Sequence, residues 1–146
     1  MDPTYLASFR DTEDRHWWFR ARREIVLDRL RLLQRQDGID FLDVGCGTGG
    51  TLSFLAPAMP YARFRGIEPD PGARDHCAKR GLDVIEGTAV PLPVATGSQD
   101  AVTALDVIEH LDDDIEAVRE IARALRPGGI ALVTVPAYMW MWGAAR

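Results

Sequence analysis

The stretch FLDVGCGTGG, residues 41–50, places four glycines within six positions directly after a run of apolar and acidic residues. Its first half has the composition of a buried strand. Glycine has no Cβ, so it lets the chain turn sharply and lets a ligand approach the backbone closely. The stretch therefore predicts a strand that ends in a ligand-binding loop.

Strand-like runs alternate with helical patterns along the rest of the chain. Strands are expected at residues 39–44, 62–68, 82–87, 99–107 and 130–136. Helices are expected within residues 11–36, from the glycines to the Pro57/Pro60 pair, over residues 70–81, and from residue 112 to the RPGG segment. This alternation predicts an α/β fold with a Rossmann-like, doubly wound parallel sheet, whose ligands bind beyond the carboxyl ends of the strands.

The first 36 residues differ in charge from the rest of the chain. They hold eight arginines against six acids, whereas residues 37–146 hold nine basic against sixteen acidic groups. Phe19, Val26, Leu30 and Leu33 recur at helical spacing, which predicts an amphipathic helix. We expect an N-terminal helical arm or lid at residues 1–36 and a binding core at residues 37–146, although such an arm is most often only a solvated helix face.

The composition argues against a membrane-spanning, a secreted or a nucleic-acid-binding protein. The longest apolar stretch, residues 130–142, is interrupted by Thr134 and Pro136 and is shorter than the roughly 20 residues of a membrane-spanning helix. The opening residues lack the apolar segment of a secretory signal, and Cys46 and Cys77 form no disulfide framework. We expect a cytoplasmic protein with no membrane span, and the acidic core argues against a nucleic-acid partner.

The glycine loop alone leaves two ligand classes open. Gly45, Gly47 and Gly50 also satisfy the dinucleotide pattern G-x-G-x-x-G, and adenosyl-sulfonium cofactors use a similar loop. The flanking motifs decide, because they resemble the class I S-adenosylmethionine-dependent methyltransferases, especially the type-11, menaquinone-type group. LDVGCGTGG is similar to the first motif of that family, GIEPD to the acidic end of its second strand, GTAVPLPVATGSQDAVTALDVIEHL to its third and fourth strand segments, and ALRPGG to its turn before strand five. The resemblance covers roughly residues 39–135.

The resemblance implies S-adenosylmethionine as cofactor, S-adenosylhomocysteine as product and a small molecule as methyl acceptor. Gly45, Gly47 and Gly49 would approach the methionine portion, and Asp43 would orient its ammonium group. Glu68 would accept hydrogen bonds from the ribose hydroxyls. Asp43 as a cap of local amides, and Glu68 as an ordinary strand-end acid, are the plainer alternatives.

The remaining cofactor contacts are also implied by the resemblance. Thr88 stands where the family usually has an acid for the adenine amino group, which leaves only a hydroxyl contact, and the Ala89 backbone N–H would serve beside it. Arg22 would pair with the cofactor carboxylate. The neighbours that complete the predicted cofactor site are Cys46, Pro69, Leu105 and Asp106.

The DVIEH segment follows the fourth expected strand, where the sulfonium would lie. Asp106, Glu109 and His110 could hold a divalent cation, as E-x-x-E-H does in some relatives, but no fourth ligand is in view and we expect no metal. His110 is the candidate general base, and a packed structural histidine is its plainer alternative.

Two rival functions stay open beside the methyltransferase. A non-catalytic adenosyl-binding or interaction module would share the fold and the site. An NAD(P)-dependent reductase would share the fold and Glu68, but the chain has no Tyr-x-x-x-Lys pair and its only lysine is Lys79. Tyr138, Trp140 and Trp142 follow the last expected strand, where acceptor pockets form.

The family sheet usually has seven strands, and only five are expected here. We therefore expect a truncated relative of a longer enzyme that binds cofactor and turns over poorly. Its fifth strand, IALVTV, is uncharged and β-prone, so pairing of two copies through this edge is expected.

Overall fold

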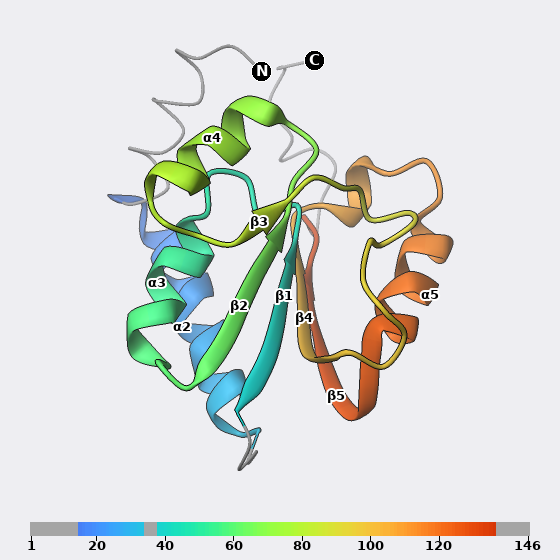
Figure 1. Ribbon diagram of the computed structural model, residues 1–146, viewed down its shortest axis with the longest axis horizontal. Helices are drawn as coiled ribbons and strands as arrows, with labels where there is room; N and C mark the ends of the chain where they lie inside the picture. Colours follow the sequence, from blue (N-terminus) through green and yellow to red (C-terminus); the bar gives the residue numbers. More distant parts are fainter. Residues whose placement is uncertain (1–14, 34–37, 137–146) are drawn as a thin grey trace.

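A computed structural model describes residues 15–33 and 38–136 of the chain. It contains a five-stranded parallel sheet in the order β3-β2-β1-β4-β5 (Figure 1). The strands are β1 (Ile39–Val44), β2 (Ala62–Ile67), β3 (Val84–Ile85), β4 (Gln99–Leu105) and β5 (Leu125–Thr134). The strand order reverses between β1 and β4, which is the position where doubly wound sheets bind ligands. The predicted α/β, Rossmann-like architecture is confirmed.

Helices cover both faces of the sheet. On one side of it lie α2, α3 and α4, and on the other lies α5 (Figure 1). The elements are α2 (Trp17–Arg31), α3 (Gly50–Ala58), α4 (Pro71–Lys79), the 3₁₀ turn η1 (Ile108–His110) and α5 (Asp114–Ala124). Side chains cap the amino ends of three of these helices. His16 accepts from the Trp18 N–H at 3.3 Å, and Asp70 and Asp113 accept from the Ala73 and Glu116 N–H groups, each at 2.9 Å.

The sheet separates two apolar clusters, and β1 contributes side chains to both because it is buried on its two faces. Ile39 and Phe41 pack with α2, α3 and α4, whereas Leu42 and Val44 pack with β4 and α5. A strand buried on both faces is typical of a parallel sheet. The core therefore holds the carboxyl end of β1 rigidly, and the glycine loop starts from that point.

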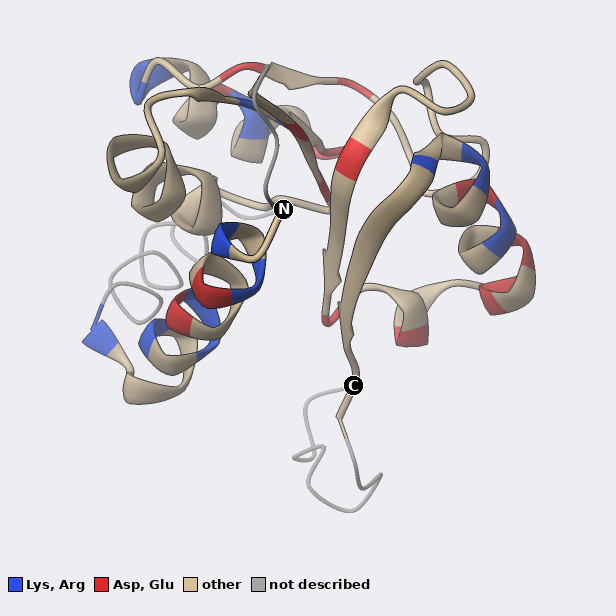
Figure 2. Ribbon diagram, turned by 90° about the horizontal axis from the view of Figure 1, so that it is seen from below, with Lys and Arg blue, Asp and Glu red and all other residues tan. Residues whose placement is uncertain are grey.

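The predicted N-terminal amphipathic helix is present as α2. Its Val26, Leu27 and Leu30 are buried in the same cluster as β1 and α3, while Ile25 is exposed. Basic and acidic bands alternate on the ribbon of α2 (Figure 2). This packing fixes one face of α2 on the core, and its movement as a lid stays a prediction.

Several predicted boundaries were wrong, most of all in the third strand and between the last helix and the fifth strand. The third strand is only Val84–Ile85 instead of residues 82–87, since it pairs with no more than Gly66 and Ile67 of β2. The last helix ends at Ala124 rather than at RPGG, and the fifth strand starts at Leu125 rather than at residue 130. Arg126 precedes a proline, which disfavours helical geometry.

Ion pairs explain why the RPGG segment runs beside the sheet. Arg126 contacts Asp100 at 2.7 Å and Asp40 at 2.9 Å, so the segment is drawn alongside β4 and β1. The pairing shifts register between Gln99 and Ala101, which accommodates the glycines. The RPGG segment, which was predicted to end a helix, is therefore held as part of β5 by ion pairs at the amino end of the sheet.

Some predictions concern parts of the chain outside the described residues. Tyr138, Trp140 and Trp142 lie there, as do residues 1–14. Within the described ranges, no helix is both long enough and apolar enough to cross a membrane.

Candidate functional site

The loop after β1 is shaped by glycines in left-handed conformation. Gly45, Gly47 and Gly49 have φ values of 67°, 55° and 81°. A Cβ on Gly45 would lie 2.7 Å from Val107 Cγ2, whereas a Cβ on Gly47 would meet no atom of the described residues within 4 Å. Gly45 thus permits close packing against the segment after β4, and Gly47 borders open space at the carboxyl end of the sheet. That space is where a ligand can approach the loop backbone.

Glu68 joins the glycine loop to the end of β2. Its side chain is 7% exposed, and its two carboxylate oxygens accept the N–H groups of Gly47 at 2.9 Å and Asp70 at 3.0 Å. A carboxylate offers about four acceptor positions, so two remain. Glu68 can hold the loop and still accept from two hydroxyls of a ligand.

Asp43 lies beneath the loop at the end of β1 and is 2% exposed. The Thr103 hydroxyl donates to its Oδ1 at 2.6 Å, across the register in which the two residues pair. Sequence reasoning missed Thr103, whose only signal is a polar residue within the apolar run of β4. The hydrogen bond fixes the Asp43 carboxylate, and its action on a cofactor ammonium stays a prediction.

Asp106 has an unusual backbone where β4 ends. Its φ is 57°, and it is the only non-glycine residue of the described chain with positive φ. The Thr134 hydroxyl donates to Oδ1 at 2.8 Å, and Arg22 of α2 forms an ion pair with Oδ2. Positive φ costs energy and is enriched at functional sites. The fold therefore maintains Asp106 in this position through contacts from two other elements.

Arg22 is brought to the carboxyl end of the sheet, as its predicted role requires. The residue is 9% exposed, and its guanidinium lies 5.1 Å from the centroid of the Phe19 ring. It pairs with Asp106, and its buried Nε has no hydrogen-bond partner among the described residues. Pairing with a cofactor carboxylate stays a prediction, and the free Nε leaves a donor for it.

Glu109 and His110 form the short η1 turn after β4. Both carboxylate oxygens of Glu109 are buried and lack a hydrogen-bond partner within the described part of the chain. His110 Nε2 lies 4.0 Å from Glu109 Oε1, and the His110 side chain is 59% exposed. An imidazole that is open to solvent and beside a carboxylate can exchange a proton. In the described ranges, no cluster of three or more His, Cys, Asp or Glu could hold a metal ion.

The predicted adenine contacts lie on the loop after β3. Ala89 is 5% exposed, and the exposed Thr88 donates its hydroxyl to the Val90 carbonyl at 2.8 Å. That bond uses the Thr88 proton locally, so its oxygen is left as an acceptor. Arg74, which sequence reasoning missed, donates to the carbonyls of Glu68 at 2.8 Å and Pro69 at 2.7 Å.

The predicted site residues thus gather at one edge of the sheet. Direct contacts join Gly47 to Glu68 and Arg22 to Asp106, and Gly45 lies against the segment after β4. Leu105 ends β4, and Cys46 is buried between the first two loop glycines.

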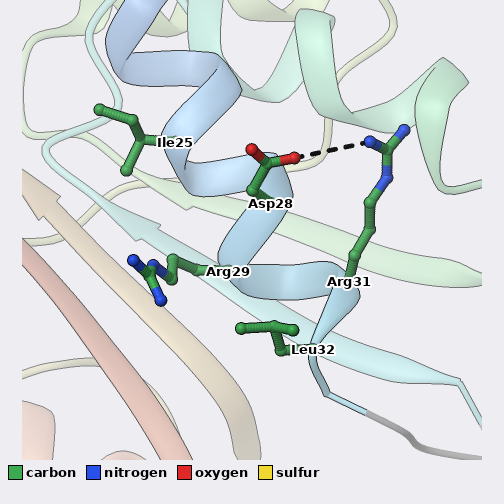
Figure 3. A pocket seen from close by; sticks show the side chains of 5 residues that line it. All are labelled: Ile25, Asp28, Arg29, Arg31 and Leu32. Carbon is green, nitrogen blue, oxygen red and sulfur yellow. Dashed lines mark ion pairs between the residues drawn. The ribbon is translucent and has the colours of Figure 1, made fainter.

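A separate hollow of about 420 Å³ lies on the outer face of α2 (Figure 3). An ion pair of 3.6 Å between Asp28 and Arg31 crosses part of it. None of the predicted site residues lines this hollow. Its lining residues are Ile25, Asp28, Arg29, Arg31 and Leu32.

Comparisons with known proteins agree with this geometry. The Methyltransferase domain family model matches residues 42–133. A probable S-adenosylmethionine-dependent methyltransferase of Mycolicibacterium smegmatis is 37% identical over 84% of this chain and 47% of its own length. A ubiquinone biosynthesis O-methyltransferase of Azorhizobium caulinodans is 35% identical over 92% of this chain and 51% of its own length. The chain spans about half the length of these curated relatives.

A solved structure adds a cofactor complex. S-adenosylmethionine-bound CalS10, an amino pentose methyltransferase of Micromonospora echinaspora, matches with a TM-score of 0.75 and 26% identity. The match covers 94% of this chain and 58% of the other. By the family model, the sequence identity and the fold together, this chain belongs to the S-adenosylmethionine-dependent methyltransferases.

Proposed function

We propose that the chain binds S-adenosylmethionine at the carboxyl ends of β1, β2 and β4 and transfers its methyl group to an oxygen of a small molecule. The observation that carries the proposal is the Gly47–Glu68 contact at 2.9 Å. It places a buried carboxylate with spare acceptor positions directly beside Gly47, the loop glycine whose Cβ would meet no described atom within 4 Å. This combination suits a ligand that has a vicinal diol and an extended chain.

Each part of the cofactor has a matching group in the site. The glycine backbone would lie against the methionine portion, with Asp43 orienting its ammonium group and Arg22 its carboxylate. Glu68 would accept from the ribose hydroxyls, and the Ala89 N–H would donate to the adenine. The bound cofactor supplies a methyl group already activated on a sulfonium.

The acceptor would lie over the segment after β4. Asp106 and η1 lie in this segment, which packs against the glycine loop, since a Cβ on Gly45 would lie 2.7 Å from Val107 Cγ2. His110 would remove the proton of an acceptor hydroxyl, and Glu109, 4.0 Å away, would stabilise the imidazolium. The protein's task is to hold acceptor oxygen and methyl carbon in line at about 3–3.5 Å. The O-methyltransferase name of one relative supports an oxygen acceptor.

Turnover tests the proposal. The chain is mixed with S-adenosylmethionine and a panel of small phenols, alcohols and carboxylic acids, and S-adenosylhomocysteine is measured by mass spectrometry. We expect acceptor-dependent product from the chain and none from the Gly47→Val variant. Equal background product from both proteins with every acceptor would contradict catalysis and favour the non-catalytic binding module.

We also expect the protein to be located in the cytoplasm. A second expectation is that copies of the chain pair through β5. Within the described residues β5 is an edge of the sheet, and Val133 is 44% exposed. We expect light scattering at ~100 μM to give the mass of a dimer or larger species. A monomer mass at that concentration would contradict edge pairing.

A further inference from the structure

Two buried thiols meet beneath the glycine loop. Cys46 lies between the first two loop glycines and is 7% exposed, and Cys77 of α4 is fully buried. Their sulfur atoms lie 3.9 Å and 3.3 Å from the same oxygen, the carbonyl of Gly47. The chain contains two cysteines in all, so these two are each other's only possible intramolecular disulfide partner.

The surroundings hold both sulfur atoms close to the loop. A Cβ on Gly66 would lie 2.5 Å from Cys46 Sγ, and a Cβ on Gly49 would lie 3.0 Å from Cys77 Sγ. The thiols also interact with each other. Hydrogen bonding from the Cys46 thiol lowers the pKa of Cys77, and the same interaction raises the pKa of Cys46. Cys77 is therefore the more acidic thiol of the pair and the expected nucleophile.

We propose that Cys46 and Cys77 form a redox-active pair, which a peroxide converts into a disulfide that lowers the affinity of the chain for S-adenosylhomocysteine. The effect on affinity rests on the proposed function, whereas formation of the bond rests on the geometry of the two thiols alone. Neither thiol reacts in the proposed methyl transfer, and of the two cysteines only Cys46 belongs to the predicted cofactor site.

The oxidation balances with hydrogen peroxide as the oxidant. The Cys77 thiolate attacks one peroxide oxygen, the O–O bond breaks, and water leaves after protonation, so Cys77 becomes a sulfenic acid. The Cys46 sulfur then attacks the Cys77 sulfur, the S–O bond breaks, and a second water leaves. The two thiols lose two electrons and two protons together, and the peroxide is reduced to two waters.

The disulfide would act on the loop through Gly47. An S–S bond replaces both S–H groups, so neither sulfur can still donate to the Gly47 carbonyl, and this part of the loop can shift. The Gly47 N–H is the group that Glu68 accepts. A displaced Gly47 would therefore disturb both the backbone against which the cofactor lies and the carboxylate that accepts from its ribose.

Access to Cys77 requires a local opening. The helix α4 precedes β3, a strand of two residues at the edge of the sheet, so few ladder hydrogen bonds hold this corner. Hydrogen peroxide is small enough to enter a brief opening, and bound S-adenosylhomocysteine would slow the reaction by holding the loop. We thus expect oxidation that is slow and is protected by ligand.

The test uses the 146-residue chain, hydrogen peroxide and S-adenosylhomocysteine. Intact mass after peroxide should fall by about 2 Da, the loss of two hydrogens, with no dimer on a non-reducing gel. Calorimetry should show at least a tenfold weaker affinity, and dithiothreitol should restore both values. The Cys77→Ser variant should bind like the reduced chain before peroxide and keep its affinity after it, and Cys77→Ala serves as a second variant in case serine is poorly tolerated in the core.

Each result decides the inference. No mass loss, or a mass gain from sulfinic acid alone, would overturn the disulfide. A disulfide with unchanged affinity, or equal loss of affinity in Cys77→Ser, would overturn its effect on the loop. If the reduced chain binds no S-adenosylhomocysteine, the proposed function fails together with the coupling, while the mass still reports whether the thiols pair.

Discussion

The two sides of the carboxyl edge of the sheet are built differently. Beside β1 and β2, the Glu68 carboxylate already accepts two backbone N–H groups, and Asp43 accepts from Thr103. Beside β4, the buried oxygens of Glu109 and the buried Nε of Arg22 have no hydrogen-bond partner within the described residues. The first side is preorganised by the fold, whereas the second offers polar groups that a ligand can satisfy.

This difference predicts which substitutions should weaken ligand binding most. On the first side, backbone geometry and one carboxylate define the site, so a substitution should weaken every adenosyl ligand. On the second side, side chains from separate elements meet, so a substitution should affect only the part of the ligand that it touches. The following variants test that contrast, from the largest effect to the smallest.

Gly47→Val should abolish binding of S-adenosylhomocysteine in calorimetry. The residue has a φ of 55° and borders open space, so a branched side chain would both strain the loop and fill the ligand position. We expect a loss of at least a hundredfold in affinity.

Gly97→Val is the matched control for that variant. Gly97 also has positive φ, 60°, and a Cβ there would also meet no described atom within 4 Å, but it precedes β4 at the opposite end of the sheet. Both variants should lower the melting temperature to a similar extent, and only Gly47→Val should lose binding. Equal loss of binding in the two variants would show that strain, and not the ligand position, is responsible.

Glu68→Ala should weaken binding of S-adenosylhomocysteine by about 1.5–3 kcal/mol, because hydrogen bonds to a charged acceptor are lost. Binding of adenosine should weaken by a similar amount, since both ligands contain the ribose. Glu86→Ala is the control, because the Glu86 side chain is 78% exposed and forms an ion pair with Arg74 at 3.0 Å. Unchanged affinity for both ligands in Glu68→Ala would exclude this carboxylate from the site.

Arg22→Met should have the smallest effect and the most selective one. Loss of the guanidinium should lower the affinity for S-adenosylhomocysteine roughly tenfold and leave the affinity for adenosine nearly unchanged, since only S-adenosylhomocysteine carries a carboxylate. Arg29→Met, on the exposed outer face of the same helix, should change neither affinity. Equal weakening of both ligands by Arg22→Met would refute the carboxylate contact and assign Arg22 to holding Asp106.

The parts of the fold that sequence predicts well are those with strong local signals. The β1 strand and its glycine loop combine apolar burial with glycine, and both were placed correctly. The boundary between α5 and β5 was wrong because Arg126 pairs with Asp40 and Asp100, which lie far away in sequence. Local propensity does not contain such contacts.

The same limit applies to the site. Glu68 stood out because its distance from the glycines is characteristic, whereas Thr103 and Arg74 did not. Their roles depend on the strand register, Asp43 opposite Thr103, and on the reach of an arginine to two carbonyls. The Arg22–Asp106 pair joins residues 84 positions apart, so only the packing of α2 against the core reveals it.

The central claim is that the preorganised side binds an adenosyl ligand and not a dinucleotide. Calorimetric titration of the reduced chain with S-adenosylhomocysteine and, separately, with NADH tests it most directly. The account predicts one site with a dissociation constant on the order of micromolar for S-adenosylhomocysteine and no measurable heat from NADH. Binding of NADH with no binding of S-adenosylhomocysteine would contradict it.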